Sequence, residues 1–206
     1  MQVRNLAECC PTATLDPLGF VRRSTQRLHA AIERDTPLAR LADRDCTVED
    51  YRAALGPLMR IYGTLDRQLV GAEHWRQWDV GPYRQRSPFL IEELYRWGQG
   101  CGPNAGDGPR LDSAAAYLGV RYVVDGAQFG HRVIAASLAR SPAATVVAHR
   151  PSFWSTAFVS TAEWRCLCKA LAGLDTRIET AQAARAARST FELFSRELHM
   201  PAERAV

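Results

Sequence analysis

Three residues near the N-terminus recur at the spacing of one helical turn. Thr25, His29 and Glu33 stand four residues apart in the segment RRSTQRLHAAIE, residues 22–33. In a helix they form one stripe, because residues four apart lie one above the other. A neutral imidazole is a good iron ligand, and Arg22, about 10 Å before His29 on nearly the same face, could meet a carboxylate. The stripe predicts either a metal-ligating histidine or a histidine at the border of an ordinary amphipathic helix.

Two glycines interrupt a second predicted helix. Gly126 and Gly130 are one turn apart and therefore share one face. Each costs about 0.5–1 kcal/mol relative to alanine in a helix interior, so the pair requires a reason. A backbone without Cβ atoms can lie against a flat ligand, bend, or pack closely on another helix. Together with His29, the pair predicts a flat ligand held between two helices, with close helix–helix packing as the alternative.

Two further segments carry residues of interest. Arg165 and Lys169 are four apart in WRCLCKAL, residues 164–171, and can present both cations to one ligand edge. A solvated basic face is the alternative reading of this pair. Phe191 lies in the last predicted helix, within ARSTFELF, residues 187–194.

In order and separation, these four segments resemble the heme oxygenase family over residues 17 to 198. The Thr-x-x-x-His-x-x-x-Glu stripe resembles the proximal helix of that family, and Gly-x-x-x-Gly followed by Val-Ile resembles its distal helix. Residues 164–171 are similar to the helix near the heme propionates, and residues 187–194 to the closing helix. With YVVDG at 122–126, the resemblance is closest to the bacterial heme oxygenases that serve bacteriophytochromes.

The resemblance implies an all-α, single-domain heme oxygenase-like fold that holds heme b between a proximal helix and a kinked distal helix. Heme b is both cofactor and substrate in that family, and it is cleaved with O2 to biliverdin, CO and ferrous iron. Ferredoxin or a flavin reductase supplies the electrons, and a bacteriophytochrome is the expected client for biliverdin. A heme-binding sensor or carrier with little turnover is one alternative, and a helical bundle without heme that works through protein contacts is the other.

The roles that the resemblance implies for single residues are specific. His29 ligates the iron, and Thr25 and Glu33 position its helix or ring. The propionates pair with Arg22, Arg165 and Lys169, the distal backbone at Gly126 and Gly130 faces the iron-bound ligand, and Phe191 lines the heme pocket.

The chain departs from the family pattern at two positions. His131 stands where relatives have a third glycine, and Ala127 stands where an Asp or Ser often follows the first glycine. If His131 points at the iron, it becomes a sixth ligand. Because it is about 100° around the helix from Gly130, we expect it to point outward or sideways. The distal water network is then expected to depend on Gln128, Tyr122 or backbone carbonyls.

Helical signals dominate the rest of the chain, and no segment alternates as a strand would. Residues 1–15 are expected to be a loose tail and residues 16–200 one domain of about seven helices. Helices are expected to begin after Asp16, at Pro37, at the Thr47–Asp50 capping box, at Ser87, after Asp112, and near residues 161 and 176. Pro57 is expected to kink or split the third of these helices.

Composition limits the classes of partner. The 206 residues carry a formal charge of +4, and Lys169 is the only lysine among 26 basic residues. No basic run of five residues occurs, which argues against nucleic acid, whereas an acidic electron donor fits the charge. No signal peptide or apolar run of about 18 residues is present, so we expect a cytoplasmic protein without a membrane anchor. The six cysteines form no Cys-x-x-Cys pair and are expected to be reduced.

Overall fold

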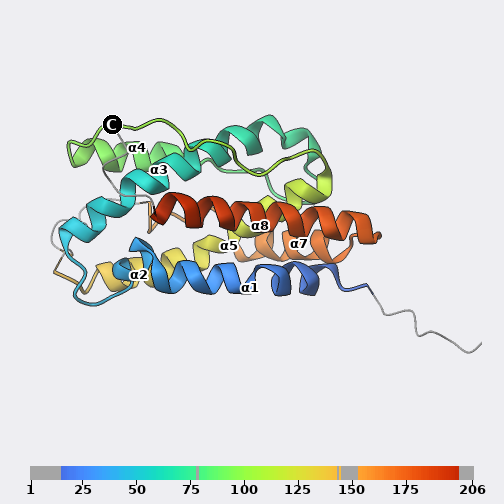
Figure 1. The fold of residues 1–206 in the computed structure, drawn as a ribbon, viewed down its shortest axis with the longest axis horizontal. Coiled ribbons are helices and arrows are strands. Elements are labelled where there is room, and N and C mark those ends of the chain that lie inside the picture. Colours follow the sequence, from blue (N-terminus) through green and yellow to red (C-terminus); the bar gives the residue numbers. More distant parts are fainter. Residues whose placement is uncertain (1–14, 78, 143, 145–152, 200–206) are drawn as a thin grey trace, which may run out of the picture.

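The computed structural model describes residues 15–77, 79–142, 144 and 153–199, and this part of the chain is helical without strands (Figure 1). It holds seven α-helices and one short 3-10 helix: α1 (Pro17–Asp35), α2 (Pro37–Leu41), α3 (Val48–Gly71), η1 (Glu73–Trp75), α4 (Ser87–Arg96), α5 (Ala114–Leu138), α7 (Thr161–Ala172) and α8 (Arg177–His199). The all-α prediction is therefore confirmed. The expected tail lies outside the described residues except for Leu15.

Most helix starts follow the capping signals in the sequence. Asp16 accepts a hydrogen bond from the Gly19 amide at 2.9 Å, and Thr47 and Asp50 form the reciprocal capping box of α3. The predicted cap at Asp112 is wrong by one residue. Ser113 has the extended backbone of an N-cap, and its hydroxyl accepts a hydrogen bond from the Ala116 amide at 3.2 Å.

Helix α3 runs without a break through Pro57, so the expected split does not occur. The residues after the proline explain this, because Leu58, Ile61 and Leu65 are fully buried and hold the second half of the helix in the core. The interior proline removes one backbone hydrogen bond, and tertiary packing offsets that loss.

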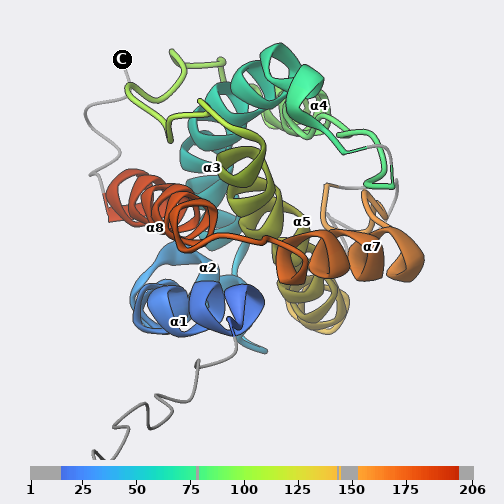
Figure 2. The ribbon, with the colours of Figure 1, turned by 90° about the vertical axis from the view of Figure 1, so that its right-hand side faces the viewer.

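Helix α8 lies at one side of the molecule, between α1 and α3, and packs against α1, α3 and α5 (Figure 2). A Cβ atom at Gly119 of α5 would overlap the backbone carbonyl oxygen of Ala183 in α8. This glycine therefore permits the backbones of α5 and α8 to approach closely at this point. The sequence analysis assigned it no role, since one glycine in a helix does not reveal which helix will face it.

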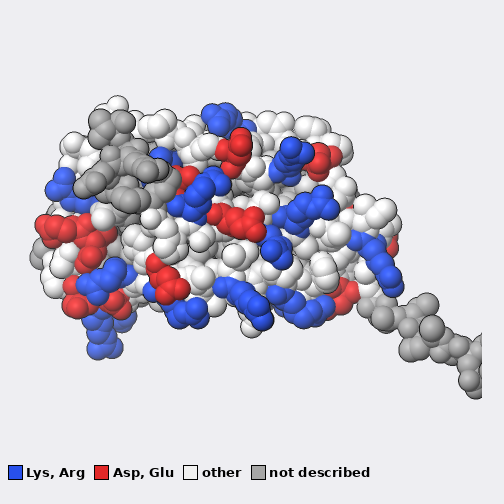
Figure 3. Space-filling view, in the orientation of Figure 1, with Lys and Arg blue, Asp and Glu red and all other residues white. Residues whose placement is uncertain are grey.

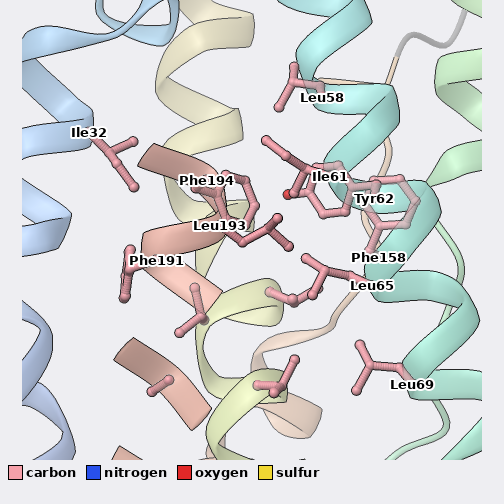
Figure 4. Close-up of a cluster of buried hydrophobic side chains, with 14 of the residues drawn as sticks. Ile32, Leu58, Ile61, Tyr62, Leu65, Leu69, Phe158, Phe191, Leu193 and Phe194 are labelled. Carbon is pink, nitrogen blue, oxygen red and sulfur yellow. The ribbon is translucent and has the colours of Figure 1, made fainter. Parts of the chain in front are cut away.

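The hydrophobic core divides on the two sides of α8 (Figure 4). Phe194 and Leu193 lie toward α3, where the ring of Phe194 meets the ring of Tyr62 edge-on at 5.6 Å between centroids. Phe191 lies on the side of α8 that faces α1. The two long helices α1 and α5 are thus both fixed by α8, and this arrangement positions the residues of the candidate site.

Candidate ligand cavity between α1 and α5

A cavity of about 900 Å³ is lined mainly by residues of α1 and α5, with contributions from α2, α3, α7 and α8. Its volume lies in the range of small-molecule and cofactor sites, about 300–1,000 Å³. Aromatic and aliphatic side chains dominate its wall. Of the residues predicted to act at the site, it brings together nine: Arg22, Thr25, His29, Glu33, Tyr122, Gly126, Gly130, His131 and Phe191.

His29 lies on the α1 side of the cavity with its ring held on two sides. Its Nδ1 is 3.3 Å from Oε2 of Glu33, one turn later in the same helix. The Phe191 ring packs against it nearly at right angles, at 5.5 Å between centroids. Histidines that bind metals commonly use one ring nitrogen for a carboxylate partner, which fixes the ring and leaves the other nitrogen for the metal. The geometry suits His29 to present Nε2 as a ligand.

Thr25 and Arg22 hold α1 in place beside the cavity. The buried Thr25 hydroxyl donates to the carbonyl oxygen of Val21 at 2.9 Å. Burial raises the pKa of the Tyr122 hydroxyl on α5 and of the Cys168 thiol on α7, and the Arg22 guanidinium acts in the opposite direction on both groups. Arg22 therefore lies near α5 and α7 at the exposed part of the cavity wall.

The glycines of α5 leave different amounts of room. A Cβ atom at Gly126 would lie 3.2 Å from the Trp164 ring, whereas one at Gly130 would meet nothing within 4 Å. Trp164 also stacks on Tyr122 at 5.6 Å between ring centroids and meets Phe129 edge-on at 5.4 Å. The cavity wall at Gly126 is thus covered by an aromatic cluster, and the wall at Gly130 is open backbone.

Of the two directions expected for His131, outward is wrong, and sideways stays a prediction. Its residue surface is only 6% exposed, and it lines the same cavity as His29. Phe153 and Trp154 pack on its ring at 4.7 and 5.1 Å between centroids. Burial, assisted by the Arg86 guanidinium, lowers the pKa of His131 to about 3, so its imidazole is neutral at physiological pH. Helical phase alone did not reveal the distant aromatic residues that cover this side of α5.

Gln128 does not face the cavity, which removes it from the expected water network. Its amide nitrogen donates to the carbonyl of Val159 at 2.5 Å, and its amide oxygen accepts from the Val159 amide at 2.6 Å. This paired contact fixes the segment before α7 against α5. Tyr62 of α3, which sequence reasoning did not select, lines the cavity instead. A tyrosine within an amphipathic helix gave no signal that distinguished it from a core residue.

A buried ionic cluster lies at the α5 side of the core. Arg86 and Arg121 each contact a different oxygen of the Asp125 carboxylate at 2.8 Å. Asp66 accepts from the Tyr83 hydroxyl at 2.5 Å and from the Arg86 amide at 2.9 Å. The two carboxylates balance the two guanidinium groups, so the cluster satisfies its own charges and rigidly supports the centre of α5.

Arg165 and Lys169 do not line the cavity. Both are exposed on α7, while the cations in the cavity wall are Arg22 and Arg23 of α1. Basic side chains are frequent along the edge of the molecule formed by α1, with acidic side chains between them (Figure 3). An anionic ligand group in the cavity would therefore meet α1 first.

Compared with known protein families, curated proteins and solved structures, the chain matches none. Among the described residues, no helix has the length and apolarity needed to span a membrane, and no three His, Cys, Asp or Glu side chains gather as a metal site. Fold and site thus define an all-α protein with an aromatic cavity whose wall carries two histidines.

Proposed function

We propose that this protein is a heme oxygenase that cleaves heme b to biliverdin, CO and ferrous iron. The observation that carries the proposal is that His29 of α1 and the Gly126–Gly130 face of α5 line one cavity. The sequence resemblance named the same two helices as the proximal and distal walls of a heme site. A helical bundle without a ligand would give no reason for these two segments to border a shared space of about 900 Å³.

The lining residues fit heme in three respects. His29 supplies one imidazole whose Nδ1 already has a carboxylate partner, as expected for a heme ligand. Apolar and aromatic side chains suit the macrocycle, and open backbone at Gly130 leaves room beside it. The exposed cations Arg22 and Arg23 of the lining suit the two propionates.

Bound heme would supply both the iron that activates O2 and the carbon skeleton that is oxidised. The chain's own residues would set its position. Glu33 orients the ring of His29, and Arg22 with Arg23 fixes the rotation of the macrocycle by charge-assisted contacts. The Trp164 cluster and Phe191 exclude water from one side.

Three partners complete the proposal. An acidic ferredoxin or a flavin reductase would dock on the basic surface near α1 and α7, where Arg165 and Lys169 are exposed. The product biliverdin would pass to a bacteriophytochrome. We place the protein in the cytoplasm, where reduced donors are present.

A second candidate function is a heme carrier or sensor with little turnover. The observation that favours it is the neutral imidazole of His131 in the wall of the same cavity. If both histidines bound the iron, they would leave no position for O2.

The deciding experiment is a hemin titration followed by a single-turnover assay in air with ascorbate and catalase. For a heme oxygenase, the Soret band forms, then decays, and chromatography identifies biliverdin. A Soret band that survives reductant and O2 supports the carrier, and no Soret shift on titration contradicts both candidates. His29→Ala should abolish the ligated spectrum, while His74→Ala, at an exposed histidine outside the cavity, should preserve it.

A further inference from the structure

Three buried polar atoms of cavity-lining residues lack a hydrogen-bond partner within the described part of the chain. They are Nδ1 of His131 on α5, the hydroxyl oxygen of Tyr62 on α3 and the indole Nε1 of Trp154, which packs on the His131 ring. Buried polar groups are almost always paired, so each exception calls for an explanation. Nδ1 of His131 is closed off from the cavity, so a guest in the cavity could reach only the other ring nitrogen, Nε2.

The surroundings of His131 select one tautomer of its ring. A neutral imidazole carries a proton on one nitrogen and a lone pair on the other. A proton on Nδ1 would be a buried donor without an acceptor, and a lone pair there is a buried acceptor without a donor; unpaired donors are the rarer of the two in protein interiors. A lone pair on Nδ1 is favoured by the field of the Arg86 guanidinium, the charge that acts on this ring. The proton therefore belongs on Nε2.

His29 has the opposite arrangement. Its Nδ1 has a carboxylate acceptor in Glu33 at 3.3 Å, so the Nδ1 proton is stabilised and Nε2 keeps the lone pair. One histidine is thus prepared to bind a metal, and the other is prepared to donate a hydrogen bond. His131 also lacks the partner at its second nitrogen that metal-binding histidines commonly have.

We propose that His131 donates a hydrogen bond from Nε2 to a small anionic or dipolar ligand in the cavity and does not ligate iron. The inference rests on the proposed function only for the identity of the flat ligand beside which this small ligand would bind. The sequence allowed His131 to be a sixth ligand of the iron; a hydrogen-bonding His131 would instead leave that position to an external ligand.

The tautomer can be tested in the protein without heme. Long-range proton–nitrogen correlation spectra of ¹⁵N-histidine-labelled protein report which ring nitrogen is protonated, and loss of one signal set in His131→Gln assigns the residue. We expect a neutral Nε2–H form for His131 at pH 7. An Nδ1–H form or a charged ring would overturn the inference, whatever the protein does with heme.

Ligand binding gives the second test. In the ferric heme complex, we expect His131→Phe to weaken azide binding about tenfold or more, and His131→Gln, which keeps an N–H donor, to recover most of the loss. Unchanged azide affinity in His131→Phe would overturn the inference. So would a low-spin wild-type spectrum without added ligand that becomes high-spin in His131→Phe. If no heme complex forms, the proposed function fails, while the tautomer measurement still decides the state of His131.

Discussion

The Nδ1 atom of His29 lies 3.3 Å from Oε2 of Glu33, one turn along the same helix. This contact gives the exposed imidazole a fixed orientation toward the cavity without any residue from another helix except Phe191. The α1 side of the cavity is therefore built almost entirely within one helix. The opposite side depends on α3, α5 and the aromatic residues Phe153 and Trp154.

The contact between His29 and Glu33 predicts a ligand-orienting role for the carboxylate. Glu33→Gln should lower heme affinity about tenfold or more, since the loss of an outer-shell partner commonly has that effect on metal binding. Hemin titration measures the change. Glu192→Gln serves as the control, because Glu192 forms a comparable exposed pair with Arg188 on α8 away from the cavity. Equal affinities for the two variants would exclude Glu33 from orienting the ligand.

Gly130 predicts opposite effects on stability and on heme binding. Its absent Cβ has nothing within 4 Å, so Gly130→Ala should stabilise the heme-free protein by about 0.5–1 kcal/mol through helix propensity. The same methyl group would enter the cavity and weaken heme binding. Gly56→Ala, at a helical glycine of α3 outside the cavity with comparable room, should raise the melting temperature without changing heme affinity. If Gly130→Ala binds heme like the wild type, the glycine face does not contact the macrocycle.

His131 predicts a pH dependence of stability. Its pKa falls from 6.5 to about 3 on folding, because burial and the Arg86 charge disfavour the protonated ring. Between these values the unfolded chain binds more protons, so stability is full above pH 6.5 and is lost as the pH falls toward 3. The free energy of unfolding should decrease by about 1.4 kcal/mol per pH unit from this group.

Denaturant unfolding of wild type and His131→Phe at pH 7, 6 and 5 measures this contribution. As the pH falls, the wild type should lose free energy of unfolding relative to His131→Phe, because the variant has no imidazole to protonate. Parallel pH profiles would show that His131 is accessible to protons in the folded protein.

Under the proposed function, the cations of α1 are expected to control which biliverdin isomers form. Arg22 and Arg23 line the cavity, whereas Arg165 and Lys169 are exposed outside it. Replacing the first pair by alanine should lower heme affinity and change the ratio of biliverdin isomers, because the macrocycle could then rotate. Replacing the second pair should leave both unchanged and slow electron delivery at low salt. If only the Arg165 and Lys169 variant changed the isomer ratio, the propionates would be bound by α7 and not by α1.

The sequence by itself determined the helices and the α1 side of the site. Caps such as Asp16 and the Thr47–Asp50 box are local, so their residue types predict helix starts directly. The stripe of Thr25, His29 and Glu33 is equally local, because residues four apart in a helix must share a face.

Tertiary structure decided everything that depends on residues distant in the chain. The burial of His131 follows from Phe153 and Trp154, and the pairing of Gln128 follows from Val159. The packing contact at Gly119 and the exposure of Arg165 also depend on which distant segments pack against these helices. Helical periodicity fixes the direction of a side chain around its own axis, but the element packed against that direction determines whether the side chain meets solvent, a partner or a cavity.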